Sequence, residues 1–234
     1  MRNHRIIFIL IMMLLIVIGV SGCMKSGKSA KEEMLEFMKN KYNEEFEFVS
    51  IGNEAWNANY TEMIVHSEKF PKGRIIVRKY GDKIVDNYTD FLMKEKIEEE
   101  LRPIIAQVYP ESNVFYRPGG MPMGDEVNQS MSIKEYSKAM IIPLSFAICI
   151  SDPSYKINKD EKVEELRKVL ESKEYICMLY IFYVKEDKLD LINDMNINDL
   201  FTDSKISDWI LCEGRFRMDR TYQFKTSRWS EINE

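Results

Sequence analysis

The chain has 234 residues, of which 45% are hydrophobic and 30% are charged, the composition of one globular domain or two small ones. This composition excludes fibrous, collagen-like and intrinsically disordered proteins. The formal net charge of -5 argues against general nucleic-acid binding, because that function needs a basic surface.

The first 22 residues have the pattern of a secretory signal peptide. Arg2 and Arg5 precede the uncharged apolar run 6–20, and two small residues follow it. As a helix this run of fifteen residues would be about 22 Å long, shorter than the hydrocarbon core of about 30 Å. We therefore expect residues 1–22 to be cleaved, which would leave 31 basic and 38 acidic side chains and a net charge of -7.

The leader ends in Val20-Ser21-Gly22-Cys23, small residues directly before a cysteine. This motif resembles the lipobox of bacterial lipoproteins. The resemblance implies that Cys23 becomes the N-terminal residue and carries a diacylglyceryl thioether, with acyl chains such as palmitate. Two or three such chains hold a protein firmly to a bilayer. Residues 23–29 would then be a polar tether on the outer, extracytoplasmic face of the cell membrane; an ordinary signal peptide or an uncleaved anchor is the alternative.

A second motif overlaps the leader. Gly22, followed after four residues by Gly27-Lys28-Ser29, matches the phosphate-binding loop of NTPases. Such a loop follows a short buried strand, whereas here the preceding run is about three times as long as a typical strand. Cleavage before Cys23 would also remove Gly22. The NTPase interpretation is therefore kept as an alternative.

Residues 30–116 are predicted to form an N-terminal α+β lobe. A capping box at Ser29 and Glu32 indicates a helix over 30–42. An amphipathic helix is expected over 89–108, bent at Pro103. Between them, runs rich in β-forming residues predict an antiparallel meander over 46–51, 60–67, 74–80 and 83–88.

Residues 117–124 contain two prolines and three glycines, which predicts a boundary or an exposed loop. A C-terminal α+β lobe, 125–234, is expected to follow. Its predicted elements are a capped helix over 132–140, a strand over 143–150, a helix over 159–172, a strand over 175–184, a hairpin turn at 186–188 into a strand over 189–193, and a last strand region over 208–220. The fold class is thus α+β, with antiparallel sheets and flanking helices. The similar order of helices and strands in the two lobes hints at a duplication; the alternative is that both lobes belong to one domain.

Catalytic signatures are missing from the chain after the leader. Its single histidine, His66, cannot build a multi-histidine metal site, and we find no nucleophile-base pair and no cofactor loop. Cys149 and Cys177 lie in apolar runs, where buried free thiols are expected rather than a disulfide. We predict neither a metal nor a cofactor.

The segment from Asp194 onward partly matches a calcium-binding loop. Asp194, Asn196 and Asn198 stand at the first three ligand positions. The glycine and the closing acid of such a loop are replaced by Asp199 and Lys205. We therefore expect an Asn/Asp-rich turn that caps the next segment.

Two regions are candidates for binding a partner. One is the Gly/Pro loop, and the other is the arginine- and aromatic-rich C-terminal run, where alternation along a strand would place arginines on one face and apolar residues on the other. The alternative for this run is a half-buried last strand whose arginines pair with acids. The candidate interaction residues are Arg117, Met121, Met123, Arg215, Arg217, Arg220 and Trp229.

These observations predict a lipid-anchored binding protein of the bacterial cell envelope rather than an enzyme. Its expected partners are the membrane, through lipidated Cys23, and a protein or an anionic envelope component, but not nucleic acid. Carboxylates are abundant, so a carboxylate-based hydrolase of envelope material remains a second alternative.

Overall fold

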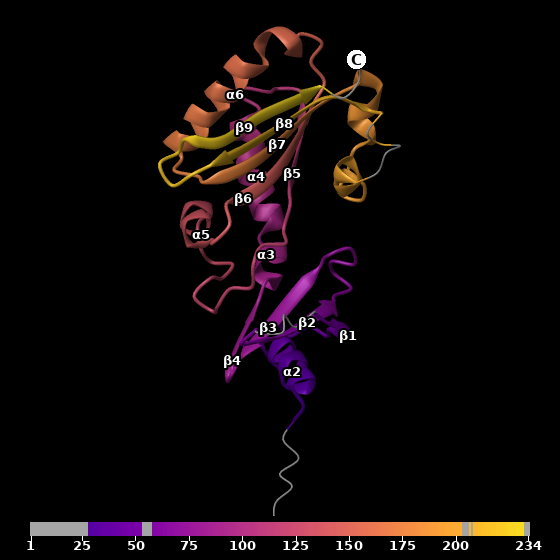
Figure 1. Ribbon diagram of the computed structural model, residues 1–234, viewed down its shortest axis with the longest axis vertical. Helices are drawn as coiled ribbons and strands as arrows, with labels where there is room; N and C mark the ends of the chain where they lie inside the picture. Colours follow the sequence, from indigo (N-terminus) through magenta and orange to yellow (C-terminus); the bar gives the residue numbers. More distant parts are fainter. Residues whose placement is uncertain (1–27, 53–57, 203–205, 207, 232–234) are drawn as a thin grey trace, which may run out of the picture.

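The computed structural model describes residues 28–52, 58–202, 206 and 208–231. The predicted signal peptide, Cys23 and both glycines of the phosphate-loop motif lie outside this range. Two sheets define a small lobe, residues 28–92, and a large lobe, residues 93–231 (Figure 1). The fold is α+β, as the sequence predicts. None of the helices in these ranges has the length and apolar character needed to cross a membrane.

The small lobe is built around a four-stranded antiparallel meander, ordered β1-β2-β3-β4. It agrees with the four strands expected from the sequence. At the tight β3–β4 turn Gly81 has a φ of 58°, a left-handed conformation that glycine adopts without a steric penalty. The elements are α2 (Ala30–Tyr42), β1 (Glu47–Ile51), β2 (Thr61–His66), β3 (Ile75–Tyr80), β4 (Lys83–Asp86) and α3 (Tyr88–Leu92).

Helix α2 begins at the predicted capping box. The Ser29 side chain accepts a hydrogen bond from the backbone N–H of Glu32, whose carboxylate accepts one from the backbone of Ser29. Lys28 forms an ion pair with Glu36 on the same helix. Lys28 and Ser29, the two described residues of the phosphate-loop motif, therefore both stabilise the N-terminal part of this helix.

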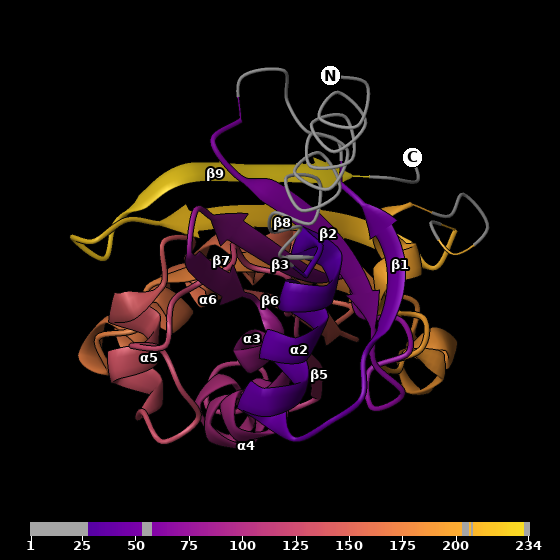
Figure 2. The same cartoon turned by 90° about the horizontal axis from the view of Figure 1, so that it is seen from below.

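Helices α2 and α3 cover the same face of the small sheet (Figure 2). Met34 and Met38 of α2 and Tyr88 and Phe91 of α3 join the inward-facing residues of β2 and β3 in one buried cluster. The spacing of four between the two methionines places them on one side of the helix, as an amphipathic pattern requires. This cluster is the core of the small lobe.

The large lobe contains a five-stranded mixed sheet, ordered β5-β6-β7-β8-β9. Strands β6 and β7 are parallel and are connected through helix α6, whereas the other neighbours are antiparallel. The elements are α4 (Lys94–Ile105), β5 (Ser112–Tyr116), α5 (Ile133–Ala139), β6 (Leu144–Ile150), α6 (Tyr155–Ser172), β7 (Cys177–Val184), the 3-10 helices η1 (Glu186–Leu191) and η2 (Ile197–Phe201), β8 (Ile210–Met218) and β9 (Phe224–Glu231).

Several elements of the large lobe differ from the prediction. The strand expected over 189–193 is wrong, since η1 occupies this segment. The helix expected over 89–108 is divided at Met93, and Pro103 lies in the last turn of α4. Strands β5 and β9 were not predicted; β9 is polar enough to resemble a solvated tail, and its partner β8 supplies the pairing that makes it a strand.

The packing of α4 and β5 also places the lobe boundary earlier than expected. Ile97, Leu101 and Ile105 of α4 are fully buried in the core of the large lobe, and β5 is the first strand of the large sheet. The predicted N-terminal lobe, 30–116, therefore includes two elements that belong to the large lobe. In Figure 1, α3 and α4 follow one another from the small lobe into the large one.

Both faces of the large sheet are covered. Helices α4, α5 and α6 pack on one face, where the larger core lies. The segment with η1 and η2 covers part of the other face through Ile192, Ile197 and Leu200. Cys149, Cys177 and Cys212 are buried free thiols, which confirms the prediction for the first two. Burial raises the pKa of Cys149 and Cys177 far above its usual range, so these thiols are unreactive.

Candidate ligand pocket between the lobes

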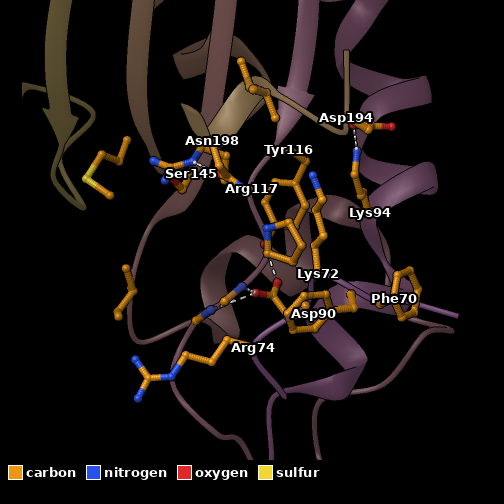
Figure 3. A pocket seen from close by; sticks show the side chains of 18 of the residues that line it. Phe70, Lys72, Arg74, Asp90, Lys94, Tyr116, Arg117, Ser145, Asp194 and Asn198 are labelled. Atoms are coloured by element: carbon orange, nitrogen blue, oxygen red, sulfur yellow. Dashed lines mark hydrogen bonds and ion pairs between the residues drawn. The ribbon is translucent and has the colours of Figure 1, made fainter. Parts of the chain in front are cut away.

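A pocket of about 620 Å³ lies where the two lobes meet (Figure 3). The small lobe contributes the β2–β3 loop and α3. The large lobe contributes the first residue of α4, the segment that leaves β5, the starts of β6 and β7, and the turn before η2. Its size falls within the range of about 300 to 1,000 Å³ that is usual for small-molecule sites.

The wall next to the small lobe is organised by Asp90, which is 1% exposed. Its Oδ1 accepts hydrogen bonds from the hydroxyls of Tyr116 and Tyr136, the latter at 2.8 Å. Its Oδ2 accepts the backbone N–H groups of Gly119 and Gly120, at 2.8 and 2.9 Å. Asp90 thus ties α3 to the Gly/Pro loop 117–124 and to α5.

Neutral donors hold this carboxylate, and no lysine or arginine of the described residues forms an ion pair with it. Burial, followed by the charge of Asp90, raises the pKa of Tyr116 and Tyr136 far above its usual value, so both hydroxyls stay protonated and donate. Because both oxygens of Asp90 are already engaged, this residue builds the pocket wall and has no free lone pair directed at a ligand. Gly119, at a φ of 135°, supplies a backbone conformation that other residues rarely adopt.

The Gly/Pro loop is consequently part of the structure that joins the lobes, and not an exposed linker. Met123 pairs with Asp86 through two backbone hydrogen bonds, of 2.8 and 3.3 Å. Asn87 donates to the carbonyl of Gly120 at 3.3 Å, and Lys41 forms an ion pair with Asp125 at 2.7 Å. The loop thus contacts the small lobe although it lies within the large lobe, since the division between the two sheets falls near residues 92 and 93.

The lining of the pocket is basic, although the whole chain is acidic. It has five basic and two acidic residues: Lys69, Lys72, Arg74, Lys94 and Arg117 against Asp90 and Asp194. Lys94 forms ion pairs with Asp194, at 2.9 Å, and with Glu98. Lys72 donates to the carbonyl of Met195 at 2.6 Å, a contact between the lobes. Lys69, Lys72 and Arg74 are exposed on the β2–β3 loop and form the rim of the pocket.

Arg117 lies on the large-lobe wall of the pocket. It is half-buried, and its backbone N–H donates to the carbonyl of Ser145 at 2.8 Å, which continues the pairing of β5 with β6. Its Nε donates to Oδ1 of Asn198 at 3.3 Å, and its guanidinium carbon lies 3.7 Å from the ring centroid of Phe201 and 5.1 Å from that of Tyr180. Within the part of the chain that the structure describes, no carboxylate forms an ion pair with it. Burial lowers the pKa of Arg117, and the nearby positive charge of Arg215 lowers it as well. Tyr180 acts in the opposite direction and raises the pKa.

The remaining lining is apolar or weakly polar. Ser145, Met178 and Tyr180 stand on the same face of the large sheet as Arg117, because side chains alternate along each strand. Further apolar lining residues include Phe70, Phe91, Met140, Ile142, Pro143 and Ile197. The site therefore combines an apolar floor, one half-buried guanidinium and an exposed basic rim.

The residues proposed from the sequence do not form one site. Arg117 lines the pocket, whereas Met121 is 40% exposed and Met123 is buried beside Asp86. Arg215 lies opposite Tyr180 on β8 and pairs with Glu213.

The C-terminal arginines alternate with apolar residues along β8, as expected. Arg215 and Arg217 are exposed and Phe216 and Met218 are buried. Arg217 and Arg220 line a different hollow, of about 380 Å³, between the end of β8 and α5. Trp229 packs on Phe216 and donates from its indole N–H to Asp160 on α6, at 2.9 Å, so it serves the core. Gly214 allows this packing, because a Cβ there would clash with the indole ring.

The segment that resembled a calcium loop forms the expected Asn/Asp-rich turn. Asn193 and Asn196 hydrogen-bond to each other and lead into η2. Asp194 points to Lys94, and Asn198 to Arg117, so the three matched residues have different partners. Across the described ranges, no group of three or more His, Cys, Asp or Glu side chains is arranged to hold a metal ion.

Sequence reasoning missed Asp90 and the basic β2–β3 loop. Asp90 stands in the run Tyr88-Thr89-Asp90-Phe91-Leu92, where an acid among apolar residues is a usable sign of a buried polar anchor. The loop could be predicted only as the break between the strands expected over 60–67 and 74–80. No sequence pattern shows that its lysines and arginine line the same pocket as Arg117.

No protein-family model matches the chain, and no curated protein matches it. One solved structure is similar to it: a DUF5037 family protein from Ruminococcus gnavus, with 16% sequence identity and a TM-score of 0.43, over 85% of this chain and 95% of that chain.

Proposed function

We propose that this chain is a lipid-anchored, extracytoplasmic binding protein of the bacterial cell envelope, and that the pocket between its lobes binds the ligand. One observation carries the second half of this proposal. The pocket is preformed, because a fully buried carboxylate holds its wall through four hydrogen bonds. Sites with a fixed apolar floor and a few directed polar groups are typical of small-molecule binding.

The position of the first residues of α2 is compatible with a lipid anchor. The N-terminal end of α2 lies at the end of the small lobe farthest from the large lobe (Figure 1). A tether at 23–29 would therefore attach the membrane to the small lobe and leave the large lobe directed away from the bilayer. The net charge of -7 expected after cleavage gives no electrostatic attraction to an anionic bilayer, so the lipid would provide the attachment.

Fractionation and mass spectrometry test the anchor. The full chain and a Cys23→Ala variant are expressed in a bacterium, with Cys212→Ala as a control that also removes one thiol. We expect an acyl-modified N-terminal peptide that starts at Cys23, and release of Cys23→Ala alone from the membrane fraction. A wild-type chain that retains Met1 without an acyl group would refute the anchor.

Ligand-detected NMR tests the pocket. The full chain in detergent is exposed to a panel of neutral, cationic and anionic small molecules. Ser145→Phe fills the floor of the pocket, and Ser130→Phe makes the same change at an exposed position outside it. We expect binding to the wild type and to Ser130→Phe, and loss of binding in Ser145→Phe. Binding that survives Ser145→Phe would place the ligand elsewhere.

A further inference from the structure

We propose that the pocket selects an organic anion, a carboxylate or a phosphate ester with an apolar body, and that Arg117 receives the anionic group. This inference rests on the proposed function of the pocket as a ligand site and adds the chemical class of the ligand. It is carried by the environment of one guanidinium, by the charges around it and by the apolar floor beside it.

Arg117 is a charged group partly removed from water without a countercharge. Its Nε is occupied by Asn198 and one face of its guanidinium lies on Phe201, but no carboxylate of the described chain contacts either Nη atom. Burial of a cation is unfavourable unless an anion and hydrogen bonds compensate it. Stacking on an aromatic ring and a hydrogen bond with the side chain of Tyr180 supply part of that compensation, and the remaining N–H donors at the edge of the guanidinium stay available.

The edge of a guanidinium is suited to carboxylate and phosphate oxygens, because its N–H groups form a planar fork that binds two oxygens at once. The neighbouring polar groups are also compatible with an anion. Ser145 has a hydroxyl donor, and Asn198, which accepts from Arg117, retains its amide N–H groups.

The basic rim favours the same ligand charge. Lys69 and Arg74 are exposed at the rim, and neither forms an ion pair with another described residue. In Figure 3 Lys94, by contrast, is joined to Asp194 by an ion pair. A concentration of positive charge on an otherwise acidic protein attracts anions to this opening.

The rest of the pocket fits an apolar body. Met140, Ile142 and Met178 lie beside the basic residues, and Tyr180 offers a ring face that already contacts Arg117. A ligand of matching shape would place its anionic group on Arg117 and its apolar part on this floor. A free inorganic anion would use only the first of these contacts, so we expect it to bind more weakly.

Isothermal titration calorimetry on the detergent-solubilised full chain tests this selectivity. The probes are phenylacetate, phenyl phosphate, inorganic phosphate and phenylacetamide, which is the uncharged counterpart of phenylacetate. We expect both aromatic anions to bind at least about tenfold more tightly than phenylacetamide, since a charge-assisted bidentate contact exceeds a neutral one by more than about 1.4 kcal/mol. Inorganic phosphate measures how tightly an anion binds without an apolar body.

Three variants assign the effect to Arg117. Arg117→Met removes the charge and should weaken the aromatic anions about tenfold or more without changing phenylacetamide. Arg117→Lys keeps the charge, loses the planar fork and should give an intermediate affinity. Lys168→Met removes one charge from the exposed side of α6 and should change nothing.

Equal affinity for phenylacetate and phenylacetamide, or an Arg117→Met variant that binds anions as the wild type does, overturns the inference. If Arg117→Met does not fold, Arg117→Lys decides, because unchanged anion affinity in that variant also overturns it. When neutral and anionic compounds bind alike and Ser145→Phe removes both, the pocket function stands and the anion selectivity fails. When no compound binds, both proposals fail.

Discussion

The large lobe removes two arginines from water and surrounds them in opposite ways. Arg167 on α6 is 8% exposed, pairs with Glu164 at 2.7 Å and Glu171 at 2.9 Å, and donates to the carbonyl of Tyr222 at 2.9 Å. Its hydrogen bonds with Glu164, opposed by burial and supported by Glu171, raise its pKa above the usual value. Arg117 on the pocket side has one amide oxygen and two aromatic rings as neighbours, and its pKa is lowered.

This difference in surroundings distinguishes an arginine that stabilises the fold from one that is able to bind an anionic ligand. A guanidinium that the protein itself neutralises contributes to folding and has little left to offer a ligand. A guanidinium that is partly desolvated and lacks a carboxylate is stabilised by an incoming anion. We therefore expect mutations on the α6 side of the sheet to change the stability of the protein, and mutations on the pocket side to change ligand binding.

The largest effect should come from the buried anion of the pocket, Asp90. Asp90→Ala leaves two buried tyrosine hydroxyls and two backbone N–H groups without their acceptor, so we expect the free energy of unfolding to fall by on the order of 4 kcal/mol. Urea unfolding monitored by tryptophan fluorescence measures it. Asp82→Ala, at an exposed turn, is the control and should change stability little. A loss below about 1 kcal/mol would show that Asp90 does not hold the pocket wall.

Arg167→Met should have the next largest effect. The substitution removes a buried guanidinium and leaves the negative charges of Glu164 and Glu171 without their shared cation. We therefore expect the free energy of unfolding to fall by about 2 kcal/mol. The same urea titration measures it. Lys168→Met, the next residue along the exposed side of α6, is the matched control. Unchanged stability in Arg167→Met would remove the contrast between the two arginines.

The acid-dependent stability of the α6 side should follow Asp152. Burial raises its pKa, but Lys162, at 2.8 Å, and Ser154 outweigh burial and lower it to about 2. A carboxylate whose pKa is lowered by folding adds stability above its ordinary pKa of 3.8, and this stability is lost as the pH falls from about 3.8 toward 2.

Asp152→Asn tests this assignment by unfolding at different pH values. We expect it to lower the free energy of unfolding at pH 7 by about 1 to 2 kcal/mol. The difference from the wild type should shrink between pH 4 and 2, as the wild-type carboxylate becomes protonated. A difference that does not depend on pH would mean that the charge of Asp152 is not the cause.

The smallest stability effect should be that of Arg117→Met. Since no carboxylate of the described chain neutralises Arg117, we expect a change of less than about 1 kcal/mol in the free energy of unfolding, in either direction. Phenyl phosphate should raise the melting temperature of the wild type and not that of the variant. A loss as large as that of Arg167→Met would show that Arg117 is structural.

Local sequence signals were sufficient for much of the small lobe and for the start of α5 in the large lobe. The capping boxes at Ser29 and Ser132 form as predicted, because each depends on residues three positions apart. The β-meander also follows, since its strands pair with their neighbours in sequence and short turns join them. Strand β9 and η1 did not follow, because their conformation depends on what lies beside them in the large sheet.

The same limit applies to the site. Arg117 was a candidate from its place in a Gly/Pro loop, but the other candidates were scattered over the core, a second hollow and the surface. Asp90 is 29 positions from Gly119, and Lys72 of the β2–β3 loop is 123 positions from Met195, and no local pattern connects such positions.

The sequence by itself determined the fold class, the two capped helix starts, the meander and the expectation of a lipidated leader, because these depend on composition, periodicity and short motifs. The tertiary structure decided where the lobes divide, which strands complete the large sheet and which basic residues share a pocket. The physical reason is that the role of the charge on Arg117 depends on what folding places around it: aromatic rings, an amide and a basic rim and, among the residues that the structure describes, no carboxylate.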